Sequence, residues 1–174
     1  DITGRKRTEE ALRESEEKYK SLANNLNVGV FRNTEGSEGK FIEANPAIVK
    51  MFGFDSKEEF LKIKVTDLYK KSADRKKYSE KLLNAGAVQN EELQLQKKDG
   101  TAFIGSVSAV VVENKKNKIK YYDGIIEDIT ERKRTELAIR QSEEKYRTVL
   151  EANPDPVVVY DIEGKVIYFN PAFT

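Results

Sequence analysis

The strongest strand pattern in the chain is ELQLQKKDGTAFIGSVSAVVVENKKNKIKYYDGIIEDITERK, residues 92–133. Asp99-Gly100 is typical of a tight hairpin turn, and segments rich in β-branched and aromatic residues lie on both sides of it. A polar turn at 114–118 separates the second of these segments from a third. The pattern predicts three consecutive antiparallel strands, at residues 88–97, 101–113 and 119–129.

Shorter elements precede this stretch. The segments 28–33 and 40–44 are typical of two strands around a glycine-rich turn. Asn45-Pro46 predicts the start of a short helix, because Asn is a good N-cap and Pro is tolerated in the first helical turn. Another helical turn is expected to begin at Asp55 or Ser56.

A longer helix is expected over residues 74–85, where Gly86 ends it. Strands and helices are therefore segregated along the chain rather than alternating. This order predicts an α+β fold, with a five-stranded antiparallel sheet that has its helices on one face.

The chain contains an internal repeat. DITGRKRTEEALRESEEKY at residues 1–19 recurs as DITERKRTELAIRQSEEKY at 128–146, with 15 of 19 positions identical, and Asn45-Pro46-Ala47 recurs as Asn170-Pro171-Ala172. The shift of 127 residues between the two longer copies is the size of a domain with its linker. We therefore expect a linker and N-terminal helix at 1–18, a complete domain at 19–130, a linker helix at 131–150 and the truncated start of a second domain at 151–174.

The truncated second domain supplies only two strands and the beginning of a helix. Two strands without a larger sheet are marginal in water. We expect this piece to be ordered only where it packs on the first domain, on the linker helix or on a neighbouring chain.

Both copies of the repeat have a heptad pattern typical of coiled-coil helices. Its members in the first copy are Thr8, Leu12, Ser15, Tyr19, Leu22 and Leu26, and in the second copy Thr135, Ile139, Ser142, Tyr146 and Val149. The pattern predicts flanking helices that pair in a homodimer. The alternative is an amphipathic helix that packs on its own domain.

Composition excludes most catalytic and metal centres. With no Cys and no His, the chain cannot form disulfides or nucleophiles of the Ser-His-Asp and Cys-His types, and zinc, haem and copper sites lose their usual ligands. No glycine-rich phosphate loop occurs, and no pair of carboxylates is distinguished among the 30 acidic residues. We expect no catalytic residue and no metal site.

Charge and hydropathy limit the partners. The net charge is +1, and the basic runs at 5–7 and 132–134 lie beside acidic residues, which favours solvated helix starts over phosphate-binding patches. No apolar run approaches the roughly 20 residues of a membrane span, and no signal-peptide pattern occurs. We expect a cytoplasmic protein that binds neither nucleic acid nor a membrane.

Five motifs, in their order and spacing, resemble the PAS family. They are EKYKSLANNL (17–26), ANPAIVKMFGF (44–54), ADRKKYSEKLLNAG (73–86), ELQLQKKDGTAF (92–103) and YYDGIIEDITERK (121–133). The resemblance covers residues 19–130, with a partial second copy from about 146.

This resemblance implies a five-stranded antiparallel sheet with helices curled over one face. It also implies a cavity between sheet and helices that in some members holds a small molecule, haem or flavin. Events in the cavity or sheet would alter the helices that flank the domain. The parent protein would be a sensory histidine kinase or a cyclase that makes a nucleotide second messenger, with adjacent PAS and output domains as partners.

The absence of Cys and His limits which ligands the cavity could hold. The flavin photoreceptors of the family need a reactive cysteine, and its haem-binding members usually offer an axial histidine, so a small organic ligand or no ligand remains. The phospho-acceptor histidine of a kinase would have to lie outside this chain.

Asp128, Ile129 and Thr130 end the last strand and begin the following helix, and in related domains this triplet couples sheet to helix. We expect Thr130 to cap that helix, and Asp128 to accept hydrogen bonds or pair with a basic residue.

Six residues are candidates for the cavity: Asn45, Tyr78, Leu82, Ser106, Ser108 and Tyr122. Ser106 and Ser108 share one face of their strand, and the sequence leaves open whether that face points inward or to solvent. For Asn45, a helix cap is favoured over a ligand contact. Tyr121 and Tyr122 are adjacent, so one should face inward and the other toward the N-terminal helix or a second subunit.

Two functions remain after an enzyme is excluded by the missing residue types. The first is a binding module whose cavity holds a small ligand, and the linker helix at 131–150 transmits the binding event. The second is a ligand-free module that dimerises and relays a signal between its neighbours. A cavity larger than a few waters would favour the first, and a tightly filled core would favour the second.

Overall fold

The computed structural model describes residues 2–25, 27–36, 38–113 and 120–173. Within its first helix it describes only the side chains of residues 6, 7, 9–11, 13–15, 17, 18, 21 and 22. The chain divides into two compact units, residues 1–130 and 131–174.

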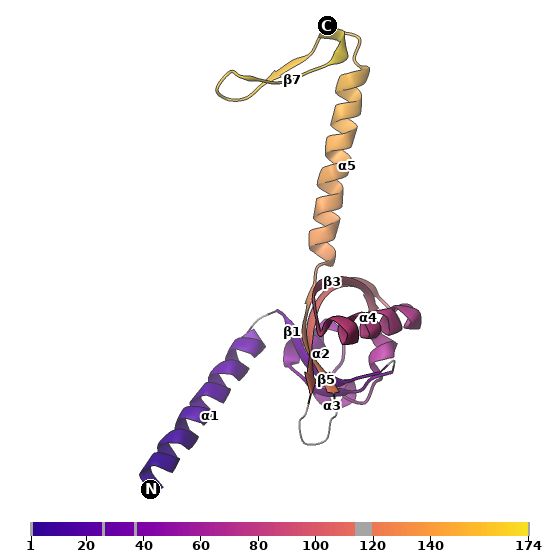
Figure 1. Ribbon diagram of the computed structural model, residues 1–174. Coiled ribbons are helices and arrows are strands. Elements are labelled where there is room, and N and C mark those ends of the chain that lie inside the picture. The colour runs from indigo at the N-terminus through magenta and orange to yellow at the C-terminus, as the bar shows by residue number, and fades with distance from the viewer. Residues whose placement is uncertain (1, 26, 37, 114–119, 174) are drawn as a thin grey trace. The chain divides into compact units, whose positions relative to one another are not determined.

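A five-stranded antiparallel sheet forms the first unit's frame (Figure 1). Its strands are β1 (Gly29–Thr34), β2 (Phe41–Ala44), β3 (Ala87–Gln96), β4 (Ala102–Glu113) and β5 (Lys120–Asp128), in the spatial order β2-β1-β5-β4-β3. All five predicted strands are confirmed, with bounds that differ by one residue at most where the structure describes them. The polar turn at 114–118 and residue 119 lie outside the described residues.

The first strand pairs with the last. Gly29 lies opposite Ile126 and Thr34 opposite Tyr121, so β5 is central in the sheet with β1 on one side and β4 on the other. The central strand β5 is also the strand that leads into the helix after residue 130.

Helices of the first unit are α1 (Ile2–Asn25), α2 (Pro46–Met51), α3 (Lys57–Phe60) and α4 (Ser72–Ala85), with the 3-10 turn η1 at Val65–Leu68. Ser56 caps α3 by accepting the amide of Glu59 at 3.1 Å, which agrees with the helical turn expected to begin at Asp55 or Ser56. Helix α4 begins two residues before its predicted start and ends at Gly86, whose φ of 75° lies in the left-handed region that glycine adopts easily. It packs against β3 and β4 (Figure 1).

One apolar core fills the space between the sheet and α2, α3 and α4. On β4, alternation buries Phe103, Val107 and Ala109, and α4 contributes the buried Tyr78 and Leu82. Three phenylalanine rings join the layers: Phe41 lies 4.6 Å from Phe60, and Phe52 lies 5.9 Å from Phe60 between ring centroids. Each such fully buried ring contributes about 1.5–3 kcal/mol to stability.

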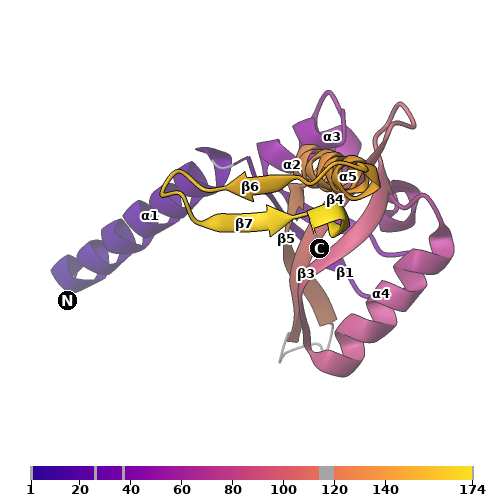
Figure 2. The same ribbon diagram turned by 90° about the horizontal axis from the view of Figure 1, so that it is seen from above.

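The second unit consists of α5 (Thr130–Ala152), whose first residue belongs to the first unit, and the strands β6 (Val158–Tyr160) and β7 (Val166–Phe169), followed by η2 (Pro171–Phe173). Strands β6 and β7 form an antiparallel hairpin, seen in yellow in Figure 2. Helix α5 has no buried residue among those described. Within the described ranges, no helix combines the length and the apolar character needed to cross a bilayer.

Candidate functional site

The joint between the sheet and α5, the helix by which the chain leaves the domain, is held by three hydrogen bonds. The amide of Thr130, the first residue of α5, donates to Oδ1 of Asp128 at 2.9 Å. The amide of Ile104 on β4 donates to Oγ1 of Thr130 at 2.9 Å, and the amide of Ile129 donates to the Ile104 carbonyl at 2.9 Å. The side chain of Ile129 is 1% exposed. The joint is therefore tied to the neighbouring strand β4 by the backbone of the buried Ile129 and by the hydroxyl of Thr130.

Of the two polar residues of this joint, Asp128 accepts a hydrogen bond as expected, whereas Thr130 has a partner that differs from the expected one. The Thr130 hydroxyl, predicted to cap α5, accepts the amide of Ile104 instead, because β4 continues past the end of β5 and presents that amide to it. The carboxylate of Asp128 accepts the first helical amide, where a negative charge also interacts favourably with the helix dipole.

A small cavity of about 30 Å³ lies between the sheet and the helices of the first unit. Its lining includes Asn33, Tyr69, Arg75 and Tyr78 among apolar neighbours such as Ile126. A water molecule occupies about this volume, whereas pockets for organic ligands run to about 300–1,000 Å³.

Of the six residues expected at the cavity, Tyr78 lines it. Leu82 and Tyr122 are buried in the core but are not part of the lining. The hydroxyl of Tyr122 is hydrogen-bonded to Oγ of Ser79 at 3.0 Å, so this tyrosine is a satisfied core residue. Tyr122 faces inward and Tyr121 is half-exposed, as their adjacency predicted.

Ser106 and Ser108 do not line the interior cavity. Their neighbours Phe103, Val107 and Ala109 are the buried ones, so both serines lie on the opposite, outer face of β4. The Ser108 hydroxyl accepts the amide of Asn90 at 2.9 Å, beside the bulge of β3.

Asn45 connects α2 to the first strand. Its Oδ1 accepts the amides of Ile48 at 3.1 Å and Val30 at 2.9 Å, and its Nδ2 donates to the Val28 carbonyl at 3.0 Å. This geometry agrees with the helix cap favoured by the sequence.

The repeated Asn170 makes a corresponding connection in the second unit. Its Oδ1 accepts the amide of Val157 at 2.8 Å, and its Nδ2 donates to the carbonyls of Leu150, Asn153 and Asp155. The Asn-Pro-Ala motif thus joins the start of a module to its first strand in both copies.

A buried arginine is the main feature that the sequence analysis missed. Arg75 on α4 is 2% exposed, its Nη2 donates to the Gly36 carbonyl at 3.3 Å, and its guanidinium lies 5.5 Å from the centre of the Tyr122 ring. With its amide oriented to satisfy both neighbours, Asn33 accepts from Arg75 Nη2 and donates to the Tyr122 carbonyl, each at 3.2 Å. Helical spacing could have identified it, since Arg75, Tyr78 and Leu82 share one face of a helix.

Burial shifts the titration of the two tyrosines in this region. Desolvation raises the pKa of Tyr78 above its ordinary value, and repulsion from Tyr69 adds to that rise. Burial likewise raises the pKa of Tyr69, although the nearby positive charge of Arg75 opposes it. Both phenols are therefore neutral donors at neutral pH.

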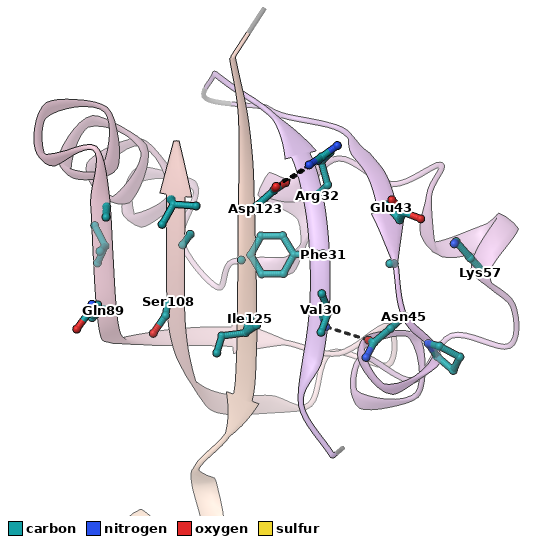
Figure 3. A pocket seen from close by; sticks show the side chains of 17 residues that line it. Val30, Phe31, Arg32, Glu43, Asn45, Lys57, Gln89, Ser108, Asp123 and Ile125 are labelled. Carbon is teal, nitrogen blue, oxygen red and sulfur yellow. Dashed lines mark hydrogen bonds and ion pairs between the residues drawn. The ribbon is translucent and has the colours of Figure 1, made fainter. Parts of the chain in front are cut away.

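The outer face of the sheet forms a much larger open concavity, of about 790 Å³, with side chains from all five strands (Figure 3). Within this lining, Arg32 on β1 and Asp123 on β5 form a two-pronged ion pair, with both N–O distances at 2.6 Å. Val30, Val110 and Ile125 supply apolar surface around the pair.

The predicted helix seam is only partly described. The side chains of Leu12 and Tyr19, and the whole of Leu26, lie outside the described residues, and Leu22 is exposed. In α5, the seam residues Ile139, Tyr146 and Val149 are exposed.

No group of three His, Cys, Asp or Glu side chains in the described part of the chain could hold a metal ion.

Comparison with known proteins agrees with this architecture. A family model described as a PAS domain matches residues 27–131, and a second PAS domain model matches residues 144–174. The chain belongs to the PAS domain family. PAS domains are in general non-catalytic sensory modules.

A curated relative of this PAS chain is sporulation kinase E of Bacillus subtilis (strain 168), to which it is 25% identical over 176 residues. The match covers 98% of this chain but 22% of the kinase, so the chain spans about a fifth of that relative's length.

Two solved structures have the same fold as this PAS domain. An RNA-binding light-oxygen-voltage receptor superimposes with a TM-score of 0.57 at 21% identity, over 71% of this chain and 36% of that one. A PAS domain from a two-component sensor histidine kinase gives a TM-score of 0.54 at 18% identity, over 67% of this chain and 98% of that one.

Proposed function

We propose that this chain is a signal-relay segment of a larger sensor kinase, with a complete PAS module at residues 19–130 followed by a linker helix at 131–150. The PAS match and the likeness to sporulation kinase E support a kinase parent. The kinase output and any phospho-acceptor histidine belong to other parts of that parent, since the chain contains no histidine.

The joint at Asp128, Ile129 and Thr130 is the observation on which this proposal rests. Central strand β5 ends at this joint, and the joint is bonded to β4 by two hydrogen bonds. Each such bond contributes about 1 kcal/mol, so the joint is rigid enough to move α5 when the two strands shift against each other. A relay needs only a coupling of about 1–3 kcal/mol between two arrangements.

The filled interior favours a relay over a small-molecule sensor. A cavity of about 30 Å³ is far below the size of an organic ligand site. The missing Cys and His argue against cysteine-linked flavin and haem in the same space. The input signal would then arrive through α1 or through contacts of the sheet rather than through a bound metabolite.

The relay would act within a homodimer, in which α5 pairs with α5 of a second copy. The seam residues Ile139, Tyr146 and Val149 are exposed on α5 at spacings of seven and three, as in a heptad repeat. Pairing of this seam with the same seam of a second copy would bury it, and a change at the joint would then alter the register or spacing of the pair.

Native mass spectrometry of the freshly purified chain tests both parts of the proposal. We expect a dimer with no retained organic molecule. A chain that stays monomeric at tens of micromolar, or one that retains a stoichiometric metabolite, contradicts the relay.

Two single substitutions on α5 sharpen the test of the dimer. Ile139→Glu places a charge on the seam, and Leu137→Glu places the same charge off the seam on an equally exposed position, since the two side chains are 54% and 56% exposed. Sedimentation equilibrium should show a weaker dimer for Ile139→Glu and an unchanged one for Leu137→Glu. Equal behaviour of the two variants would refute pairing through this seam.

A further inference from the structure

Arg75 is a buried cation without a carboxylate partner. Only 2% of the residue is exposed, and no carboxylate of the described residues lies within ion-pair distance of it. Its hydrogen-bond partners, the Gly36 carbonyl, the Asn33 amide and the Tyr69 phenol, are neutral. Buried charges in proteins are almost always paired, because an unpaired one keeps a large desolvation cost.

Two nearby carboxylates do not neutralise this cation. Glu91 is bound to Lys81 at 2.5 Å on the outside of α4, and Asp74 is half-exposed at the start of that helix. The positive charge of Arg75 is therefore not compensated by the described side chains that surround it.

Two buried hydrogen-bond donors lack partners at the same place. Nε of Arg75 and the hydroxyl of Tyr78 have no hydrogen-bond partner among the described residues, and both residues line the interior cavity of about 30 Å³. Buried polar atoms without a partner are rare in folded proteins and usually indicate a bound water or ion. Both donors need an acceptor, and a guanidinium favours one that is negatively charged.

Gly39, which lies between β1 and β2, covers this region. A Cβ on Gly39 would lie 3.0 Å from Nη2 of Arg75 and 3.1 Å from the Val65 side chain, so the backbone of Gly39 rests directly on the guanidinium. Water cannot screen the charge there as it does at the surface. A bound anion would thus interact with Arg75 in a low-dielectric setting.

We propose that the interior cavity binds one small monovalent anion, of the size of chloride or of a single carboxylate group, between Nε of Arg75 and the hydroxyl of Tyr78. A water molecule would satisfy the two donors but leave the charge uncompensated. The cavity has room for one such ion and not for a metabolite. The proposal goes beyond the relay function and does not depend on it, since the joint and the dimer seam lie on other residues.

Chloride titration tests the proposal. The chain is first prepared in sodium gluconate, and chloride then replaces gluconate at constant ionic strength while the melting temperature is followed by circular dichroism. We expect a saturable rise of about 5 °C or more when chloride reaches about a hundred times its dissociation constant. The 35Cl line width of the folded protein should show a matching excess, and its loss on adding formate would assign the site to carboxylates as well as halides.

Matched variants locate the anion. Arg75→Met should abolish the saturable rise, whereas Lys76→Met, which removes the same charge from the exposed next position of α4, should retain it. Should Arg75→Met fail to fold, Tyr78→Phe keeps the cation and removes one donor, and it should weaken chloride binding about tenfold. A wild-type chain without a saturable chloride effect, or equal effects in the Arg75 and Lys76 variants, would overturn the proposal and leave a water in the cavity.

Discussion

Thr130→Val tests whether the joint is held by the contact with β4. Valine has nearly the shape of threonine, so the substitution removes the acceptor of the Ile104 amide and little else. An unsatisfied buried donor costs about 1–3 kcal/mol. Because this bond is only partly buried, water can reach the freed amide, and we expect a loss near the lower end, about 1–1.5 kcal/mol in the free energy of unfolding.

Two measurements separate the joint from a general loss of stability. Urea denaturation reports the global loss, and amide hydrogen exchange reports Ile104 itself, which should exchange about tenfold faster. Thr66→Val is the matched control, because the Thr66 hydroxyl makes no hydrogen bond within the described residues and lies in the same unit. The control should change stability by less than about 0.5 kcal/mol.

An unchanged exchange rate at Ile104 in Thr130→Val would refute the reasoning, whatever the global stability does. The hydroxyl would then not be the acceptor that holds β4 to the joint. The case for a rigid connection between the sheet and α5 would rest on Ile129 alone.

Three further outcomes are expected from other parts of the chain. Burial raises the pKa of Tyr78 above its usual 10.0, so the neutral phenol's contribution to stability is complete below about pH 10 and is lost as pH rises toward the folded-state pKa. The urea midpoint of Tyr78→Phe should therefore fall less on the alkaline side than that of the wild type. Gly39→Ala forces a Cβ into a φ of 58° and against Arg75, and should cost about 1–2 kcal/mol by urea denaturation, with no change counting against that contact. Asn170→Ala should raise the exchange rates of the β6–β7 amides, because Asn170 is fully buried and holds that hairpin to the end of α5; retained protection would show that the hairpin has another anchor.

Local patterns predicted the elements well, because each depends on neighbours in the chain. The hairpin at Asp99-Gly100, the cap at Asn45 and the helical turn beginning at Asp55 or Ser56 involve residues a few positions apart, and they were confirmed. The adjacency of Tyr121 and Tyr122 also predicted that their side chains point to opposite faces. Such inferences need only the geometry of one strand or one helix.

The interior was harder to predict, and Ser106 and Ser108 show why. Their alternation was clear, but which face was buried depended on how β4 pairs with β3 and β5 and on the helices above it. Phe103, Val107 and Ala109 alternate with the two serines along β4, and these apolar side chains are the buried ones. Their apolar character indicates that their own face is the inner one and that the serines point outward.

The sequence by itself determined the family, the order of the strands and helices along the chain, and the repeat. Motif spacing and hydrophobic period depend only on residues that are near one another in the sequence. Only the tertiary structure decided how much space remains inside, that Arg75 is buried, and that the Thr130 hydroxyl bonds to β4 rather than capping α5. These outcomes depend on the volumes and register of segments tens of residues apart, and contacts of that kind are set by packing in three dimensions.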